Sequence, residues 1–280
     1  MFKPPEISGN VPVFDVGKHL KTGNEHRVYE SSDGQNVFKT RGILGPIWQS
    51  MDVDAARHDF DILQEHGFPV VPTEFYDDAL LRKNGRYQHT DYLVRQPKIP
   101  HNLIDFYRLE EDSRVREMVR TMMEMRHEIY KRTGLGVDLM GGDAYVDLMK
   151  TIRRHSAREV PIFWEGETPL NPPINNLLLA TEDVVRDGET VAKKDEILLM
   201  DVRLFRPAEQ SVGILRRAIA STIITPTHHV ITGAVATALE RLDSPPGNGV
   251  RDDQPWGYKL GAWAAHKMID DLRRRKDIDS

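Results

Sequence analysis

The chain has 280 residues and a mass of 32.0 kDa, enough to bury one large hydrophobic core or two smaller ones. It contains no cysteine, which excludes disulfides, thiolate catalysis and metal sites with cysteine ligands. The net charge of -5 argues against broad nucleic-acid binding, and the lack of a long apolar run or an N-terminal apolar segment predicts a cytoplasmic protein without a membrane span.

The first hundred residues are predicted to be rich in strands, with one helix among them. Short apolar runs separated by turn residues indicate the strands, and a helical spacing of apolar residues, closed by Gly67, indicates the helix. The expected elements are strands at 12–20, 27–31 and 36–40, a helix from Asp52 to His66, and a strand at 91–97.

The pattern changes to helices after Asp112. A long helix begins there, carries a stripe of methionines at helical spacing, and is expected to stop at Gly134. Further helices are expected at 143–157, 208–221, 228–242 and 256–275. Near residues 97–103, two prolines in the segment QPKIPHN break the pattern, so we expect one half to span residues 1–98 and the other 99–280.

Two short apolar runs in the second half each carry one oxygen ligand. Asn176 opens NLLL and Asp201 closes ILLMD, and RDGET at 186–190 has the composition of a hairpin tip between the two runs. Mg²⁺ prefers hard oxygen ligands and takes a few from protein and the rest from phosphates and water. The two runs therefore predict a magnesium site at neighbouring strand ends, with Asn176 and Asp201 as its protein ligands.

This order of elements resembles the protein kinase-like fold, over about residues 12–240. The resemblance implies an α+β protein with two lobes: a strand-rich N-terminal lobe with one helix, and a mainly helical C-terminal lobe with the catalytic loops. Among kinases, it is nearer to small-molecule or atypical kinases than to regulated protein kinases, because Asp201 begins DVR where the family has DFG.

The resemblance also implies residues for nucleotide binding. Gly23 matches one of the three glycines of the hairpin that covers the phosphates, and Val28 matches the residue that packs on the adenine ring. Lys39, in VFKT, matches the lysine that contacts the α and β phosphates. The family pairs that lysine with an acid on the helix of the N-terminal lobe, which here is Asp59, with Asp61 and Glu65 as further candidates.

Two assignments of the catalytic base stay open on the sequence. Asp138 follows the long helix, where the family has its catalytic loop, but Asn176 comes 38 residues later instead of after a short spacing. The rival alignment runs the loop through PLNPPINNLLL and puts Asn171 where the base belongs, which predicts a pseudokinase or the use of Asp138 or Asp143 from an adjacent loop. We favour Asp138, because the surrounding glycines suit a tight functional turn.

The function that follows from the resemblance is transfer of phosphate from ATP, with Mg²⁺, to a hydroxyl group of an unidentified small-molecule or protein acceptor. The alternative is a non-catalytic, pseudokinase-type module that binds a nucleotide or a partner. A third possibility is that the resemblance is accidental. Nothing in the sequence identifies the acceptor or the oligomeric state.

Overall fold

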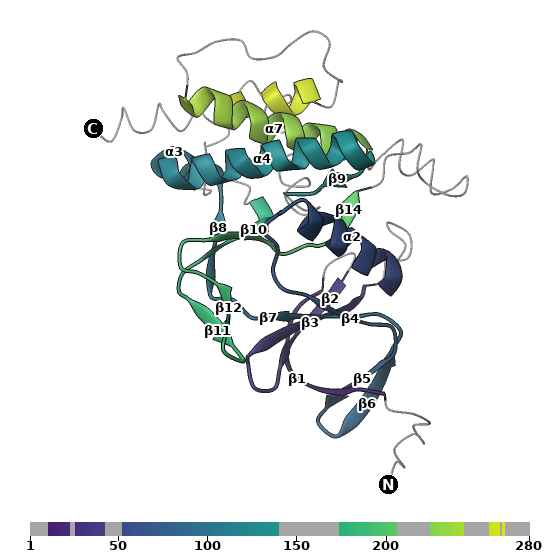
Figure 1. Ribbon diagram of the computed structural model, residues 1–280. Helices are drawn as coiled ribbons and strands as arrows, with labels where there is room; N and C mark the ends of the chain where they lie inside the picture. Colours follow the sequence, from purple (N-terminus) through teal and green to yellow (C-terminus); the bar gives the residue numbers. More distant parts are fainter. Residues whose placement is uncertain are drawn as a thin grey trace, which may run out of the picture. The chain divides into compact units, whose positions relative to one another are not determined.

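The structure is a computed structural model that describes most of the first half of the chain and parts of the second (Figure 1). The described residues are 11–22, 26–42, 52–139, 174–205, 225–243, 258–263 and 265–266. The chain divides into two compact units, Met1–Pro100 with Ala180–Lys194, and His101–Leu179 with Asp195–Ser280. None of the helices within the described ranges is long and apolar enough to span a membrane.

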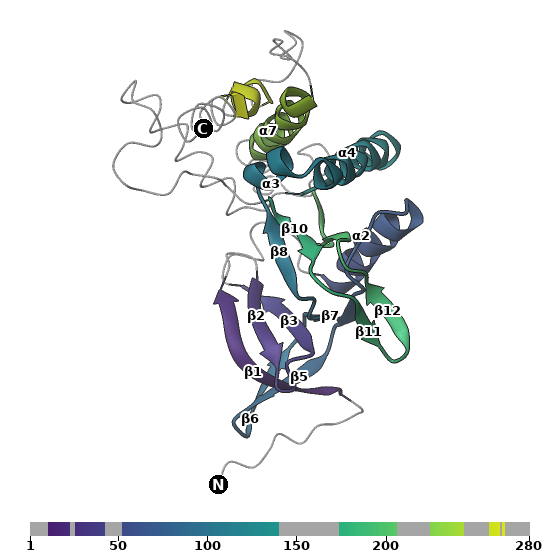
Figure 2. The same cartoon turned by 90° about the vertical axis from the view of Figure 1, so that its left-hand side faces the viewer.

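The first unit is built on a seven-stranded sheet with the strand order β4-β7-β3-β2-β1-β5-β6. All neighbouring strands pair antiparallel except β1 and β5, which pair in parallel. The strands are β1 (Val13–Thr22), β2 (His26–Ser31), β3 (Asn36–Arg41), β4 (Glu74–Tyr76), β5 (Ala79–Lys83), β6 (Arg86–Thr90) and β7 (Leu93–Pro97). Strands β1, β2 and β3 lie side by side, and the β5–β6 hairpin crosses at the N-terminal end of β1 (Figure 2).

Turn chemistry and one glycine shape this sheet. Asn84 and Gly85 have φ values of 50° and 74°, which matches the two-residue type I′ turn that Asn-Gly favours between β5 and β6. In β1 the pairing with β2 shifts register beyond Val16, as at a β-bulge, and Gly17 lies against β2. A Cβ on Gly17 would lie 3.2 Å from the Ser31 carbonyl oxygen, so a larger residue there would crowd the neighbouring strand.

The two faces of the sheet carry different cores. On one face, residues of β1, β3, β5 and β7 pack together, and the cluster consists of Val16, Phe38, Ala79, Leu81 and Leu93. On the other face, helix α2 (Val53–Glu65) packs on β7 through Val53 and Ala56 against Tyr92 and Val94. Asp52 caps α2 by accepting a hydrogen bond from the Asp54 amide. A separate two-stranded antiparallel hairpin of this unit consists of β11 (Val184–Arg186) and β12 (Glu189–Ala192).

The second unit combines helices with short strands. The helices are α3 (Phe106–Glu111), α4 (Ser113–Thr133) and α7 (Thr225–Asp243), and residues 258–263 are also helical. The strands form a three-stranded sheet in the order β13-β10-β8 and a two-stranded pair of β14 with β9. Their bounds are β8 (His101–Ile104), β9 (Gly136–Val137), β10 (Ile174–Ala180), β13 (Ile197–Leu199) and β14 (Leu204–Phe205).

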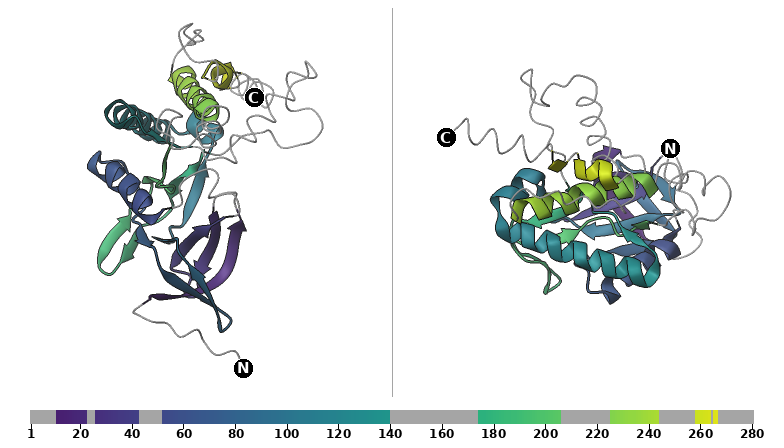
Figure 3. Two further views of the ribbon diagram at one scale, coloured as in Figure 1. Left: turned by 90° about the vertical axis from the view of Figure 1, so that its right-hand side faces the viewer. Right: turned by 90° about the horizontal axis from the view of Figure 1, so that it is seen from above.

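Helix α4 is the central helix of this unit, as its apolar spacing predicts. Asp112 caps its first turn by accepting from the Arg114 and Val115 amides, and Gly134 ends it in the left-handed conformation with φ 71°. Helix α7 lies alongside α4 (Figure 3). Residues 258–263 lie against α7 where two glycines, Gly233 and Gly261, allow the two backbones to approach closely.

The fold class is α+β, as predicted, and the predicted elements within the described ranges are confirmed with ends shifted by a few residues. The sequence interpretation missed the strands β4, β5, β6, β8, β9 and β14 and the short helix α3. It also placed the tip at 186–190 in a hairpin joining the two apolar runs, whereas β11 and β12 form a separate hairpin between them. The helices expected at 143–157 and 208–221 lie outside the described residues, and the division at residue 98 stays a prediction.

Candidate active site

In the first unit, Lys39 lies in a row of side chains on one face of the sheet. Val28 of β2 and Val94 of β7 are its direct cross-strand neighbours in the register. Directly opposed residues share a face, so Val28, Lys39 and Val94 point to the same side. Phe38 and Leu93, one residue along their strands, belong to the core on the other side. Two residues predicted to contact nucleotide, Val28 and Lys39, are therefore neighbours on one surface.

Helix α2 covers that same face, because Val94 packs against Val53 and Ala56 of the helix. Asp59 follows Ala56 by one helical turn and has 0% of its surface exposed. The other two acids considered, Asp61 and Glu65, are exposed. Of the three, Asp59 is thus the acid that faces the interior on the side of the sheet that carries Lys39.

In the second unit, the predicted base and one predicted metal ligand meet directly. The Asn176 side chain donates a hydrogen bond from Nδ2 to the Asp138 carbonyl oxygen, at 2.9 Å. The Asn176 backbone amide donates to the Leu139 carbonyl oxygen at 3.3 Å. The segment after β9 is therefore fastened to the start of β10, although 38 residues separate Asp138 from Asn176 along the chain.

Asp201 lies at the end of the strand that pairs with the one carrying Asn176. Leu177 is opposite Leu199, and the ladder continues with the Met200 amide donating to the Asn176 carbonyl oxygen at 2.8 Å. Asp201 comes one residue later, and its Oδ1 accepts from the Arg203 amide at 3.1 Å. Two predicted ligands thus lie at adjacent ends of β10 and β13, as expected from the two apolar runs.

A second ladder brings the Asp138 segment to the segment after Asp201. Val137 of β9 is opposite Leu204 of β14, so an extension of the pairing by one residue places Asp138 beside Arg203. Arg203 is only 4% exposed, which is unusual for a charged side chain. The three segments with Asp138, Asn176 and Asp201 are therefore held together by backbone pairing and by one side-chain hydrogen bond.

Arg126 of α4 supports the backbone directly before Asp138. Its Nε donates to the Val137 carbonyl oxygen at 2.9 Å, and a terminal nitrogen donates to the Thr232 hydroxyl of α7 at 2.8 Å. Burial lowers the pKa of Arg126 to about 10, and the negative charge of Asp138 opposes that shift. The guanidinium thus joins two helices to the strand that leads into the candidate base.

His229 of α7 lies in the same neighbourhood. Burial lowers the pKa of His229, and the positive charge of Arg126 lowers it further. Both causes favour the neutral imidazole near neutral pH. Arg126, which interacts with the charge of Asp138, is thus a cation next to a histidine that stays neutral.

The donor set suits a magnesium ion. With Nδ2 of Asn176 engaged at Asp138, its Oδ1 accepts no hydrogen bond from the described residues, and the same holds for Oδ2 of Asp201. An amide oxygen and a carboxylate oxygen are both hard ligands. No group of three or more His, Cys, Asp or Glu that could hold a metal ion occurs within the described ranges.

Three of the sequence candidates lie outside the described residues: Gly23, the rival base position Asn171 and the further candidate base Asp143. The sequence interpretation also missed two residues that the structure places at the site, Arg126 and Arg203. A signal for Arg126 exists, because it falls on the buried stripe of α4 between Met122 and Ile129. For Arg203 the sequence shows only that DVR stands where the family has DFG.

Neither a protein-family model nor a curated protein matches this chain. Among solved structures, it is similar to an aminoglycoside phosphotransferase from Alicyclobacillus acidocaldarius, with 13% identity, 94% of this chain and 93% of that chain covered, and a TM-score of 0.31. A spectinomycin phosphotransferase in complex with ADP and spectinomycin shows 8% identity, 91% coverage of both chains and a TM-score of 0.24. The TM-scores of both superpositions are too low to carry an argument.

The order of the elements along the chain is a stronger observation than these superpositions. A strand-rich unit has its helix after the third strand, and a long central helix then leads to short paired strands that carry Asp138, Asn176 and Asp201. These elements follow the order that the resemblance to the protein kinase-like fold, stated from the sequence, implies. The β5–β6 hairpin extends its sheet beyond β1, and the β11–β12 hairpin is inserted between β10 and β13.

Proposed function

We propose that this protein is an ATP-dependent phosphotransferase that transfers phosphate to a hydroxyl group of a small-molecule or protein acceptor. The observation that carries the proposal is the hydrogen bond from Asn176 to the Asp138 carbonyl. It joins the loop of the candidate base to a candidate metal ligand, despite the long insertion between them. A base that is next to the metal ligands is what phosphoryl transfer requires, because the acceptor hydroxyl must lose its proton as it attacks the phosphate.

Each residue has a separate task in this proposal. Lys39 binds the α and β phosphates, Val28 packs on the adenine ring, and the buried Asp59 orients Lys39. Asn176 and Asp201 hold Mg²⁺, which when bound neutralises charge on the phosphates. Asp138 orients the acceptor hydroxyl and accepts its proton. Gly23 belongs to the turn that covers the phosphates.

Arg126 is a positioning residue in this scheme and does not touch the reacting groups. Its hydrogen bond to Val137 fixes the peptide immediately before Asp138, and its bond to Thr232 fixes the guanidinium itself. A charged donor to a backbone carbonyl typically contributes about 1.5–3 kcal/mol. Arg126 therefore limits how far the carboxylate of Asp138 moves relative to the metal ligands.

The first test is the role of Lys39 in binding ATP. We expect Lys39→Ala to raise the Kd for Mg·ATP by about tenfold or more, because the variant lacks the positive charge that offsets the negative charge of the phosphates. A tenfold change in Kd corresponds to a loss of roughly 1.4 kcal/mol of binding free energy. Isothermal titration calorimetry measures this directly. Lys18→Ala, which removes an exposed lysine of β1, is the matched control and should leave the Kd within about twofold. Equal weakening in both variants would exclude a specific role for Lys39.

A further inference from the structure

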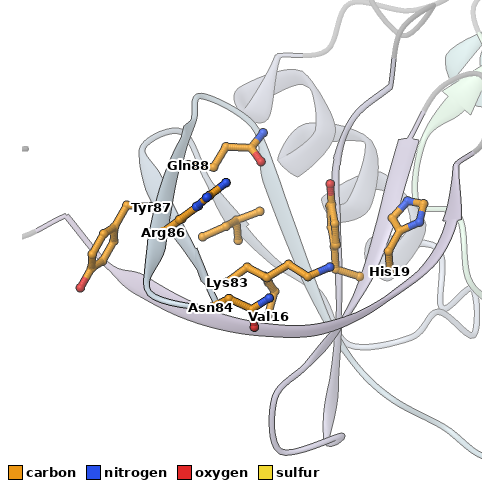
Figure 4. Close-up of a pocket in the computed structure, with 9 residues that line it drawn as sticks. Val16, His19, Lys83, Asn84, Arg86, Tyr87 and Gln88 are labelled. Atoms are coloured by element: carbon orange, nitrogen blue, oxygen red, sulfur yellow. The ribbon is translucent and has the colours of Figure 1, made fainter. Parts of the chain in front are cut away.

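A hollow of about 700 Å³ lies between strands β1 and β2 and the β5–β6 hairpin of the first unit (Figure 4). Its floor is apolar, from Val16 and Leu81, which belong to the core on the Phe38 face of the sheet. Because Lys39 follows Phe38 and points to the opposite face, the hollow is on the other side of the sheet from the proposed nucleotide residues. It is therefore a separate site.

Two cations face each other across the hairpin at this hollow. Lys83 is directly opposite Arg86 in the register, and Leu81 is opposite Gln88, so all four side chains share one face of the hairpin. Figure 4 shows Lys83, Arg86 and Gln88 directed into the hollow, whereas Tyr87 points away from it. Like charges directly opposite on paired strands destabilise a hairpin.

The neighbouring charges of the hairpin are neutralised, but these two are not. Arg82 forms an ion pair with Asp15, and His89 hydrogen-bonds Asp78 at 2.6 Å. Lys83 and Arg86 form no side-chain hydrogen bond or ion pair with any described residue. No carboxylate lines the hollow either. Lys83 and Arg86 therefore form a pair of like charges, with no ion-pair partner among the described residues, above the apolar floor of the hollow.

An aromatic wall completes the hollow. Tyr29 of β2 and His19 of β1 pack edge to face, with ring centroids 5.1 Å apart and an angle of 60° between the rings. Both line the hollow, next to Val16. A lining of aromatic and aliphatic groups suits an aromatic ring of a ligand, and two cations at the rim suit an anionic substituent on that ring.

We propose that this hollow binds a small organic anion that carries an aromatic ring, with the anionic group bridging Lys83 and Arg86 and the ring against Tyr29, His19 and Val16. The anion relieves the repulsion between the two cations, so ligand binding also stabilises the folded hairpin. The site is independent of the proposed phosphate transfer.

Phenyl phosphate is the probe for this site, with inorganic phosphate and phenol as its two halves. In ¹⁵N-labelled protein, titration should shift the amide resonances of His19, Tyr29 and residues 83–88. Phenyl phosphate should bind at least about tenfold more tightly than either half, roughly 1.4 kcal/mol. Inorganic phosphate binding as well as phenyl phosphate would overturn the aromatic part of the proposal, and equal binding of phenol would overturn the anionic part.

Lys83→Gln/Arg86→Gln tests the cations against the matched control Lys18→Gln/Lys194→Gln, which removes two exposed lysines outside the hollow. The first variant should weaken phenyl phosphate at least about tenfold and raise the Tm, since the like-charge pair is gone. The control should change neither. Equal weakening in both variants, shifts confined to other residues, or no binding at millimolar probe would each overturn the proposal.

Discussion

An Asp138→Asn variant is expected to lose phosphate transfer while it keeps nucleotide binding. General-base catalysis typically contributes about 10²–10⁴ in rate, and an amide does not accept the proton of the acceptor hydroxyl. The substitution is nearly isosteric, and the bond from Asn176 goes to the Asp138 backbone carbonyl, which the variant retains. Transfer of labelled γ-phosphate from ATP, to water or to a panel of hydroxyl acceptors, measures the rate.

The control for this variant is Asp187→Asn. Asp187 is an exposed residue at the β11–β12 turn with φ 50°, a conformation that asparagine tolerates well. It should leave both rate and binding unchanged. A loss of Mg·ATP affinity in Asp138→Asn equal to its loss of rate would indicate that Asp138 acts in binding or folding and not as a base. Full activity in Asp138→Asn would move the base elsewhere in the chain.

A Gly261→Ala variant is expected to destabilise the second unit strongly. A Cβ on Gly261 would lie 1.8 Å from the Val230 carbonyl oxygen of α7, and a Cβ on Gly233 would lie 2.2 Å from the Tyr258 carbonyl oxygen. Both neighbours are backbone atoms, so no side-chain rotation relieves the clash. Overpacking usually costs about 1–3 kcal/mol, and we expect the upper end here, seen as a Tm lower by roughly 6–12 °C.

The control separates close packing from helix propensity. Ala236→Gly, at a partly exposed position of α7, makes the reverse exchange and should cost only about 1 kcal/mol. Urea denaturation followed by circular dichroism compares the free energies of unfolding. Because alanine favours a helix more than glycine does, propensity alone predicts that Gly261→Ala is stabilising. A Gly261→Ala variant as stable as wild type would therefore show that the two helices do not approach through these glycines.

The elements that the sequence predicted are those with strong local signals. Helix α4 has a capping aspartate, a regular apolar stripe and Gly134 at its end, and each of these acts within a few residues. The missed β5–β6 hairpin also had such a signal, since Asn84–Gly85 is the preferred pair for a two-residue turn. That part of the fold was predictable from the sequence and was overlooked.

The arrangement of the site depended on contacts between distant residues. Asn176 and Asp201 could be predicted to lie near each other because each begins or ends an apolar run, and the two runs pair as β10 and β13. Their role as metal ligands stays a prediction. The bond from Asn176 to Asp138 closes a long loop, and the position of Arg203 beside Asp138 follows from the pairing of β9 with β14. Such closures leave no periodic pattern in the sequence, so the sequence alone does not show that the Asp138 segment lies beside Asn176.

If Asn176 and Asp201 hold a magnesium ion bound to ATP, the affinity of the protein for ATP depends on Mg²⁺ and on Asp201. Isothermal titration calorimetry on the wild type and on Asp201→Ala, each with Mg²⁺ or with EDTA, gives four Kd values. We predict that Mg²⁺ tightens ATP binding at least about tenfold in the wild type and leaves the affinity of Asp201→Ala unchanged. ATP binding that ignores Mg²⁺ in the wild type, or an equal tightening in Asp201→Ala, would contradict it.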